Sequence, residues 1–243
     1  MKTILAEAKR ILRGEHKINP GSIQRSEIRA LLGKDNPIIL EIGSHNGGHT
    51  QWFLDLFPTC KVFCFEPDPR ARRQFKEQIV DDRVQLFDVA ISDTDGVTDF
   101  YMSGGLPTAD WRTEMPDGWD ASGSIRRPKN HLKSAPWCTF NDKIKVVTKR
   151  LDTWCKDAGI ESVDFIWADV QGAEVDLING GTKTLSRTRY FFTEYSNHEL
   201  YEGQINLRTL LKLVPDFEVI QRYREDVLLR NKLIAPALRR TAA

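Results

Sequence analysis

Residues 38–48 read Ile-Ile-Leu-Glu-Ile-Gly-Ser-His-Asn-Gly-Gly, a short apolar run that ends in a glycine-rich loop. The run has the length of a buried strand, and we predict a strand over residues 38–43. A helix is predicted over residues 50–57, because Pro58 cannot continue it. A strand, a glycine-rich loop and a helix in this order are typical of the first unit of an open α/β sheet.

The same alternation of strand and helix continues along the chain. Further strands are predicted over residues 61–66, 84–91, 163–169, 189–194, 217–224 and 227–232, and further helices over residues 69–80, 173–185 and 206–214. Only Glu225 and Asp226 separate the last two strands, a gap that permits a hairpin and excludes a helical crossover. We therefore predict a Rossmann-like α/β fold, with helices on both faces of a mostly parallel seven-stranded sheet that ends in an antiparallel hairpin. This architecture is typical of class I methyltransferases rather than nicotinamide dehydrogenases.

The composition fits one domain with additions. A chain of 243 residues with 40% hydrophobic content can bury one substantial core. We predict a helical extension over residues 1–35 and an α/β domain over residues 36–243. Charges interrupt residues 1–14, which predicts a short amphipathic helix and not a signal peptide. No apolar run approaches the roughly 20 residues that cross a bilayer, so we expect no membrane span.

Charge and cysteine content indicate the expected partners and compartment. Lysine and arginine (35) almost balance aspartate and glutamate (34), so no global field favours a polyanion and we expect no nucleic-acid partner. The four cysteines lack the spacing of a zinc site. Cys60 and Cys64 flank a predicted strand and would lie roughly 13 Å apart, too far for a disulfide. We therefore expect reduced cysteines and a cytoplasmic protein.

The loop after the first strand is the first candidate binding element, because ligands of open α/β sheets bind at the carboxyl ends of the strands. Gly43 permits a tight turn, and Gly47 or Gly48 permits a ligand to approach the backbone. The spacing differs from both the dinucleotide fingerprint and the P-loop. A Glu-x-Gly-x-x-x-Gly loop suits a sulfonium amino-acid nucleoside, S-adenosylmethionine, although such loops also occur for structural reasons.

Acidic residues follow the next two strands. Glu66 ends the second strand about 20 residues past the glycines, where an acidic side chain normally accepts the ribose hydroxyls, and Pro67 then redirects the chain. Asp88 lies in the third predicted strand just before Val89 and Ala90, at the level where an adenine amino group needs an acceptor. Taken singly, each acid could equally face solvent or cap a helix. Together they indicate one nucleoside site.

From residue 38 to residue 197 the chain resembles the FkbM-type methyltransferase family. The family's Asp-x-Gly-Ala-Asn-x-Gly loop is similar to residues 41–47, with Glu41, Ser44 and His45 in place of the aspartate, alanine and asparagine. Its Phe-Glu-Pro is present at residues 65–67. The similar segments farther along are Ala-Ile-Ser at 90–92, Ser-Gly-Ser at 122–124, Leu-Asp at 151–152 and Asp-Val-Gln-Gly-Ala-Glu at 169–174.

Two positions depart from the family pattern on the reaction side. Gln171 replaces the first glutamate of Asp-x-Glu-Gly-x-Glu, and Trp167 stands where the family often has lysine. The resemblance implies S-adenosylmethionine as cofactor and O-methylation of sugars or secondary metabolites. The residues that we expect at the cofactor are Glu41, Gly43, Ser44, Asn46, Gly47, Glu66, Pro67, Asp88, Val89, Ala90 and Asp169.

Methyl transfer to a hydroxyl requires alignment and removal of a proton. Asp169 is a candidate for the base, for a ligand of a divalent cation, or for a helix N-cap. Glu194 and His198 are candidates to orient the acceptor or, for Glu194, to share a metal with Asp169, although His198 could be an ordinary loop residue. Glu174 fits a first-turn helix carboxylate. His45 and His49 could contact the carboxylate of the cofactor or simply belong to the loop and the helix start.

The segment from about residue 104 to residue 145 interrupts the pattern with an insertion. It is rich in Gly, Pro, Trp and basic residues, namely Trp111, Trp119, Trp137, Arg126, Arg127 and Lys133. Loops of this length are usually functional or disordered, and three tryptophans argue against plain disorder. The insertion could pack its own small cluster on the surface, or it could be an acceptor-binding lid. Tryptophan faces suit sugar rings, and the basic residues suit a phosphate or carboxylate or form a solvated stretch.

Three functions compete at this stage. The leading hypothesis is an S-adenosylmethionine-dependent O-methyltransferase that acts on a saccharide or related small metabolite. A binding protein that keeps the cofactor pocket without catalysis is suggested by Trp167 and Gln171. Methylation of protein or nucleic acid is disfavoured by the balanced charge and by the absence of an Asn/Asp-Pro-Pro-Tyr/Phe tetrapeptide. The sequence leaves the oligomeric state open.

Overall fold

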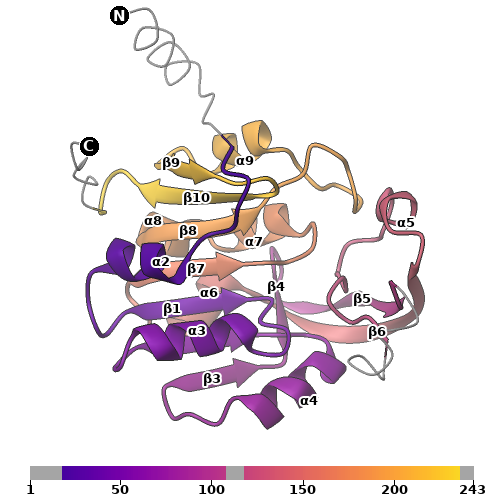
Figure 1. Cartoon of the computed structure of the whole chain (residues 1–243), viewed down its shortest axis with the longest axis horizontal. Coiled ribbons are helices and arrows are strands. Elements are labelled where there is room, and N and C mark those ends of the chain that lie inside the picture. The colour runs from indigo at the N-terminus through magenta and orange to yellow at the C-terminus, as the bar shows by residue number, and fades with distance from the viewer. Residues whose placement is uncertain (1–17, 108–117, 236–243) are drawn as a thin grey trace, which may run out of the picture.

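A seven-stranded sheet forms the centre of the molecule (Figure 1). The computed structural model describes residues 18–107 and 118–235, and the sheet has the strand order β3-β2-β1-β7-β8-β10-β9. Its strands are β1 (Ile38–Ile42), β2 (Lys61–Phe65), β3 (Val84–Phe87), β7 (Val163–Ala168), β8 (Thr188–Glu194), β9 (Phe217–Arg222) and β10 (Asp226–Asn231). The chain order reverses between β1 and β7, so the carboxyl ends of these two strands form the crevice in which ligands of such sheets bind.

The strand directions confirm the predicted fold. Strands β3, β2, β1, β7 and β8 are mutually parallel, and β10 is antiparallel to both β8 and β9. The hairpin connection is residues 223–225, slightly displaced from the predicted turn at Glu225 and Asp226. Asp226 begins β10 and pairs with Glu194 at the end of β8, a pairing that brings two acidic side chains to the edge of the crevice.

Helices cover both faces of the sheet because the strands are apolar on both sides (Figure 1). Ile39 packs toward α2 (Arg25–Leu32), α3 (Gly48–Leu56) and α4 (Pro69–Gln78). Its neighbour Leu40 packs toward the helices of the other face, α6 (Leu151–Asp157), α7 (Glu174–Gly180), α8 (Thr182–Ser186) and α9 (Leu207–Leu213). This alternation is the period of two expected of a strand buried between layers. The predicted helix over residues 173–185 is two helices, because the chain breaks at Gly181.

A second sheet of three strands corrects the prediction of a single strand over residues 84–91. Strand β4 (Val89–Ser92) pairs in parallel with β6 (Cys138–Arg150), which pairs in the antiparallel direction with β5 (Gly96–Gly105). Phe87 pairs with Phe65 in the large sheet, whereas Val89 pairs with Val147 in the small one. The chain therefore changes sheets at Asp88, and a continuous apolar pattern does not reveal such a change of partner.

The small sheet also corrects the bounds of the insertion. Residues 104 and 105 still belong to β5, and β6 begins at Cys138, so the irregular connection is residues 106–137, with α5 (His131–Ser134) near its end. The small sheet lies beside the carboxyl ends of the parallel strands (Figure 1). It is therefore placed to form one wall of the crevice.

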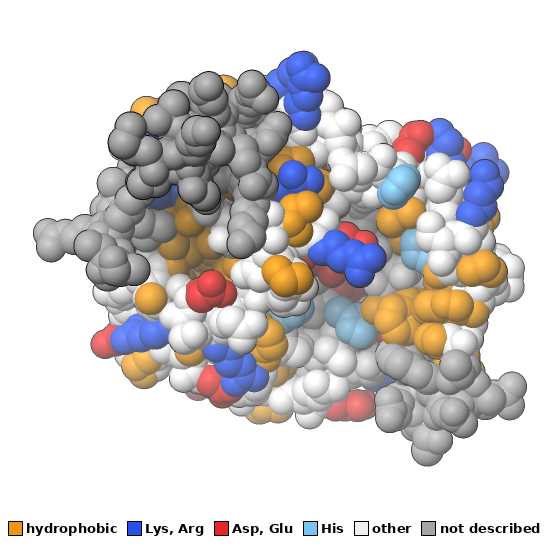
Figure 2. Space-filling view, turned by 45° about the horizontal axis from the view of Figure 1, so that its top comes forward, with side chains coloured by type: hydrophobic (Ala, Val, Ile, Leu, Met, Phe, Trp, Pro, Cys, Tyr) orange, Lys and Arg blue, Asp and Glu red, His pale blue; other side chains and the backbone are white. Residues whose placement is uncertain are grey.

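The remaining sequence predictions concern the N-terminal helix, Trp111, membrane spans, the cysteines and the surface charge. The helix predicted over residues 1–14 and Trp111 lie outside the described residues. Within residues 18–107 and 118–235, no helix combines the length and apolar character needed to cross a membrane. All four cysteines are buried free thiols, as predicted. Acidic and basic side chains are interspersed over the coloured part of the face drawn in Figure 2.

Candidate active site

Gly43 brings the loops after β1 and β7 into contact. Its φ of 83° lies in the left-handed region, and a Cβ at this position would lie 1.8 Å from the carbonyl oxygen of Asp169. The Asp169 N–H in turn donates a hydrogen bond of 2.9 Å to the carbonyl oxygen of Ile42. Only glycine permits this approach, so the conformation at Gly43 determines how close Asp169 lies to the first loop.

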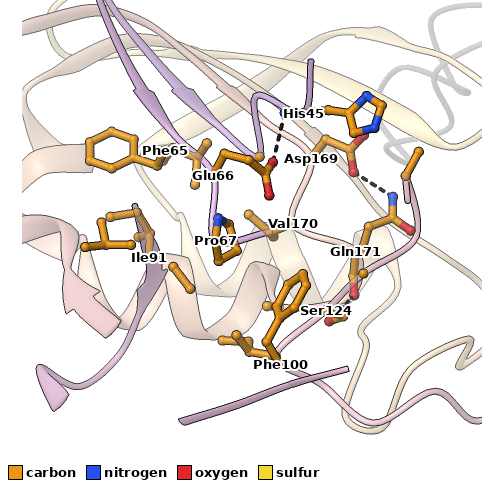
Figure 3. A pocket seen from close by; sticks show the side chains of 18 of the residues that line it. His45, Phe65, Glu66, Pro67, Ile91, Phe100, Ser124, Asp169, Val170 and Gln171 are labelled. Atoms are coloured by element: carbon orange, nitrogen blue, oxygen red, sulfur yellow. Dashed lines mark hydrogen bonds between the residues drawn. The ribbon is translucent and has the colours of Figure 1, made fainter. Parts of the chain in front are cut away.

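Glu66 follows β2 directly and holds the first loop through its carboxylate. One oxygen accepts a hydrogen bond from the His45 N–H (Figure 3) and the other from the Asp68 N–H, both at 2.8 Å. The side chain is buried, and burial raises the pKa of Glu66 to about 7 despite these two backbone bonds. The carboxylate is thus fixed in place before any ligand arrives.

The main cavity lies where these loops converge, over the carboxyl ends of β1, β2 and β7 and beside β4 (Figure 3). It has about 590 Å³ of empty space, counting its mouth and the adjoining open space. The predicted cofactor residues that line it are Gly43, Glu66, Pro67, Val89, Ala90 and Asp169. Apolar side chains line another part of it, among them Phe65, Ile91 and Phe100. An apolar surface beside a fixed carboxylate fits a nucleoside.

The other predicted cofactor residues do not line the main cavity. Gly47, with a φ of 87°, is the N-cap of α3 and packs against the side chains of α4 and its C-cap. The Asn46 side chain accepts a hydrogen bond of 3.2 Å from the Gly48 N–H at the start of α3. Ser44 is buried behind the loop. Asp88 is exposed at the point where the chain changes sheets, so the structure does not bring its carboxylate to the site where it was expected.

Glu41 also points away from the main cavity, into the protein core. It is fully buried and accepts a hydrogen bond of 2.5 Å from the Thr50 hydroxyl of α3. Burial raises the pKa of Glu41 from 4.5 to about 8. At neutral pH the side chain is therefore protonated, and its contact with α3 indicates a structural role.

We expect Glu41→Gln to flatten the dependence of stability on pH. Between about pH 5 and pH 8 the folded protein keeps the Glu41 proton and the unfolded chain does not, so the free energy of unfolding falls as pH rises, by at most about 1.4 kcal/mol per pH unit. Glutamine mimics the protonated carboxyl and removes this contribution. Chemical denaturation of both proteins across this range checks the result, and parallel pH profiles would contradict it.

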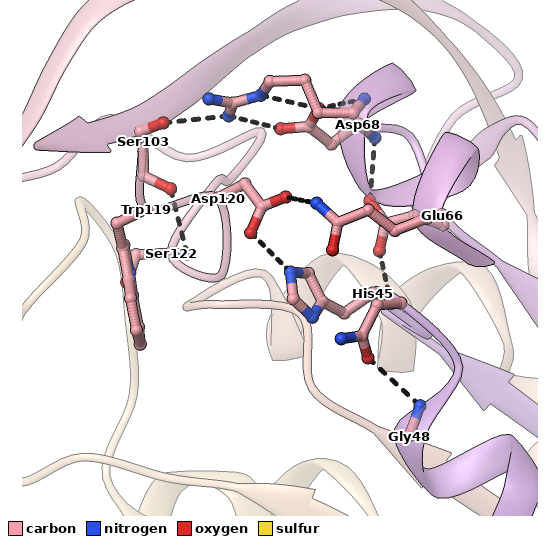
Figure 4. A network of polar contacts seen from close by, with 11 residues as sticks. His45, Gly48, Glu66, Asp68, Ser103, Trp119, Asp120 and Ser122 are labelled. Atoms are coloured by element: carbon pink, nitrogen blue, oxygen red, sulfur yellow. Dashed lines mark hydrogen bonds and ion pairs between the residues drawn. The ribbon is translucent and has the colours of Figure 1, made fainter. Parts of the chain in front are cut away.

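A network of hydrogen bonds joins the first loop to the segment between β5 and β6 (Figure 4). The His45 Nε2 lies 2.7 Å from one carboxylate oxygen of Asp120, and the Gln74 amide donates to the other oxygen at 2.8 Å. Burial by itself would lower the pKa of His45, but the hydrogen bond and the charge of Asp120 outweigh it and raise the pKa. His45 therefore presents a cation at the main cavity over a wider pH range, which suits a ligand carboxylate.

Sequence reasoning did not identify Asp120 or Gln74. Asp120 lies 75 residues from His45, and Gln74 lies in a helix whose sequence marks it only as charged and exposed. Both side chains are half-buried or buried in the structure. Their one sequence signal is that Asp120 stands beside the Ser-Gly-Ser at residues 122–124, one of the segments that resemble the family.

Gln171 bridges the two candidate catalytic carboxylates. Its amide nitrogen lies 2.6 Å from Asp169 and 3.4 Å from Glu194, and its amide oxygen lies 3.0 Å from the Tyr201 hydroxyl. Burial raises the pKa of Asp169, and burial together with the charge of Asp169 raises the pKa of Glu194 well above its usual value. An amide at this position supplies donors to both acids, where the family's glutamate would add a third negative charge.

Glu194 and His198 lie outside the main cavity. Glu194 lines a second cavity, on the other side of Asp169, together with Asp226. His198 is exposed, and its backbone N–H bonds to the Ser196 hydroxyl. Within residues 18–107 and 118–235, no group of three or more histidine, cysteine or acidic side chains is placed to hold a metal ion. Asp169 and Glu194 therefore lack a third protein ligand among the described residues.

The aromatic and basic residues of the insertion have other contacts. Trp119 and Trp137 pack edge to face with ring centroids 5.3 Å apart, and neither lines the main or the second cavity. Arg126 pairs with the buried Asp176. Arg127 and Lys133 are exposed. The insertion reaches the main cavity instead through residues 120–125.

Comparison with known proteins adds three findings. A model of the Methyltransferase FkbM domain matches residues 41–226. The chain is 50% identical over 210 residues to the 2-O-methyltransferase NoeI of Sinorhizobium fredii, covering 84% of each chain. Among solved structures, a Klebsiella pneumoniae protein that is assigned as an O-methyltransferase matches with a TM-score of 0.45 and 12% identity. The match covers 90% of this chain and 84% of that chain. Aeropyrum pernix fibrillarin bound to S-adenosyl-L-methionine matches with a TM-score of 0.41 and 14% identity, and the match covers 81% of this chain and 67% of that chain.

Proposed function

Since the chain belongs to the FkbM methyltransferase family, and is accordingly an S-adenosylmethionine-dependent methyltransferase, we propose that it methylates the 2-hydroxyl of a saccharide or related small acceptor. The convergence of Gly43, Glu66 and Asp169 on one cavity is the observation that carries the proposal. The name of the Sinorhizobium relative, 2-O-methyltransferase, supports an oxygen as the atom that is methylated and position 2 of the acceptor as the position of that oxygen.

The residues of the main cavity fit S-adenosylmethionine. The Glu66 carboxylate suits the two ribose hydroxyls, and the apolar wall that includes Phe65 and Ile91 suits a flat base. The His45 imidazole, whose pKa Asp120 raises, suits the carboxylate of the amino-acid part. The glycine at position 43 leaves the backbone free of a Cβ where the loops meet.

When bound, S-adenosylmethionine supplies the methyl group: the acceptor oxygen bonds to the methyl carbon, the carbon–sulfur bond breaks, and its electron pair stays on sulfur. The chain must hold the acceptor in line and remove the hydroxyl proton. Asp169 lines both the main and the second cavity, so its carboxylate is at the boundary between cofactor and acceptor. Its raised pKa places it closer to neutrality, where a carboxylate is a better base.

The acceptor class is tested by supplying methyl glycosides. We expect wild-type protein with S-adenosylmethionine to add one CH₂ to the mass of at least one methyl glycoside, and expect the product to carry the new methyl group on O-2. Mass spectrometry and NMR of the product give the increment and the position. Methylation confined to a protein, a nucleic acid or an amine would contradict the proposal.

We expect Glu66→Ala to weaken cofactor binding by about ten- to a hundredfold, because hydrogen bonds to a charged group contribute roughly 1.5–3 kcal/mol. The variant also loses the bonds that fix the His45 and Asp68 N–H groups. Calorimetric titration with S-adenosylmethionine measures the change. Glu77→Ala, an exposed glutamate on neighbouring α4, is the matched control and should bind as the wild type does. Equal affinity of Glu66→Ala and wild type would remove the nucleoside assignment of the cavity.

We extend the proposal to location and partners. Four buried free thiols are consistent with a cytoplasmic protein. A small acceptor, and not a nucleic acid, agrees with a net charge of +1 and with the interspersed charges of the face in Figure 2.

A further inference from the structure

The second cavity adjoins the main cavity and shares Asp169 with it. It has about 620 Å³ of empty space including its mouth, and lies over the ends of β7 and β8 and the start of β10. Helix α3 and residues 22 and 23 close its other sides. Because the transferred methyl group must pass from cofactor to acceptor without crossing solvent, a cavity that meets the main cavity at a candidate base is well placed for the acceptor.

One wall of the second cavity is aromatic. Trp167 stacks between His49 and Phe192, with ring centroids 4.3 Å away on each side. Trp52 meets His49 edge to face at 5.0 Å and stands half-exposed at the rim. Trp167 and Phe192 are 6% and 4% exposed, so they form the base of the wall while Trp52 and His49 present ring surface to the cavity. Such surfaces pack against the apolar C–H face of a sugar ring.

Other lining residues of the second cavity are acidic. Glu194 and Asp226 stand directly across from each other on β8 and β10, and both line the cavity with Asp169. Burial and, to a smaller extent, the charge of Asp169 raise the pKa of Asp226 to about 7. Among the described residues, no lysine or arginine lines this cavity, although the Arg25 guanidinium lies over the Trp52 ring, 4.8 Å from its centroid. His49 does not supply a cation either, because burial lowers its pKa to about 4.

This combination of aromatic and acidic residues discriminates between acceptor classes. Carboxylate oxygens accept hydrogen bonds from hydroxyl groups, and neighbouring hydroxyls of a sugar can each reach an oxygen. A phosphate or carboxylate on the acceptor would instead add a negative charge beside three acidic side chains whose pKa values are already raised, which costs free energy. The cavity therefore selects an acceptor without negative charge.

We propose that the second cavity is the acceptor site and that it binds an uncharged saccharide, with the sugar ring against Trp52 and His49 and its hydroxyl groups hydrogen-bonded to Glu194 and Asp226. The inference rests on the proposed function and adds the place and the charge of the acceptor. It also moves the acceptor away from Trp119 and Trp137 of the insertion, which line neither cavity.

Steady-state methyl transfer from S-adenosylmethionine to methyl glycosides tests the assignment. We expect Trp52→Ala to raise the KM for the glycoside about three- to tenfold, since aromatic packing contributes roughly 0.5–1.5 kcal/mol beyond burial. We expect Trp52→Phe to return the KM most of the way to the wild-type value. We expect Glu194→Ala, which removes the hydrogen-bonding group altogether, to lower kcat/KM for the glycoside at least about tenfold. The Kd for S-adenosylmethionine and the thermal midpoint, measured for each variant, should stay near the wild-type values and so exclude misfolding.

Trp137→Ala distinguishes the two possible acceptor surfaces. Under our assignment it leaves the glycoside KM unchanged, whereas a rise with Trp137→Ala and none with Trp52→Ala would place the acceptor on the insertion and overturn the inference. Preferred methylation of ethanolamine or of a sugar phosphate would also overturn it, by showing a charged acceptor. A wild-type protein that binds the cofactor but methylates no glycoside would overturn the proposed function as well, so the two failures are distinguishable.

Discussion

Asp169→Asn is expected to lower kcat for methyl transfer by about 10²- to 10⁴-fold, the range found when a general base is lost. Asparagine has the same shape as aspartate and can still accept the hydrogen bond of 2.6 Å that Gln171 donates. It cannot take up the hydroxyl proton of the acceptor. Because Asp169 lies between the two cavities, we expect the loss in kcat to come with a change of only a few-fold in cofactor Kd.

The pH profile separates this role from a structural one. Burial raises the pKa of Asp169, so wild-type kcat should increase with pH as the carboxyl loses its proton, and the residual activity of the variant should lack that rise. Asp142→Asn, at an exposed position of β6, is the matched control. A variant that keeps wild-type kcat would exclude Asp169 as the base and would direct attention to Glu194, the nearest acid bridged to it by Gln171.

The cofactor side of the site could be predicted because its signals are local. A glycine after the first strand and an acid after the second are each read from a few neighbouring residues, and parallel strands place both at the same edge of the sheet. The structure brings Gly43 and Glu66 to one cavity, as predicted. The seven-stranded sheet was predictable for the same reason, since each strand is a separate apolar run.

The parts that the sequence did not reveal depend on contacts between distant residues. Asp88 was expected in the site because residues 84–91 were predicted to be one strand. In the structure they form two strands: Phe87, at the end of β3, pairs with Phe65 in the large sheet, and Val89, at the start of β4, pairs with Val147 in the small sheet. Asp120, which hydrogen-bonds to the His45 ring, lies 75 residues from it in the sequence. Neither pairing leaves a periodic trace in the sequence.

The acceptor side was only partly predictable. Trp167 was noticed as a departure from the family pattern, yet its packing between His49 and Phe192 depends on how α3 lies against the sheet. The closeness of Asp226 to Glu194 follows from the register of β10 on β8, and a register cannot be read from the hairpin alone. The three tryptophans of the insertion were therefore the more conspicuous candidates, although Trp119 and Trp137 lie elsewhere.

Gly43→Ala is expected to abolish measurable cofactor binding and to lower the free energy of unfolding by more than about 3 kcal/mol, a size reserved for severe backbone or core conflicts. The new Cβ would lie 1.8 Å from the carbonyl oxygen of Asp169 and 2.9 Å from its carbonyl carbon. Both are backbone atoms, and the Asp169 N–H is hydrogen-bonded to Ile42, so the loop cannot yield without separating β1 from β7. At roughly 2–4 °C per kcal/mol, the thermal midpoint should fall by on the order of 10 °C.

Gly159→Ala isolates the steric part of this effect. Gly159 has a φ of +66°, also left-handed, but a Cβ there meets no atom within 4 Å. Its substitution should cost only the roughly 1–2 kcal/mol of placing an L-residue in that region, and cofactor binding should persist. If both alanine variants lose the same stability and Gly43→Ala still binds S-adenosylmethionine, backbone strain alone explains Gly43. A much larger loss at Gly43 identifies the close approach of the two loops as the feature that forms the cofactor site.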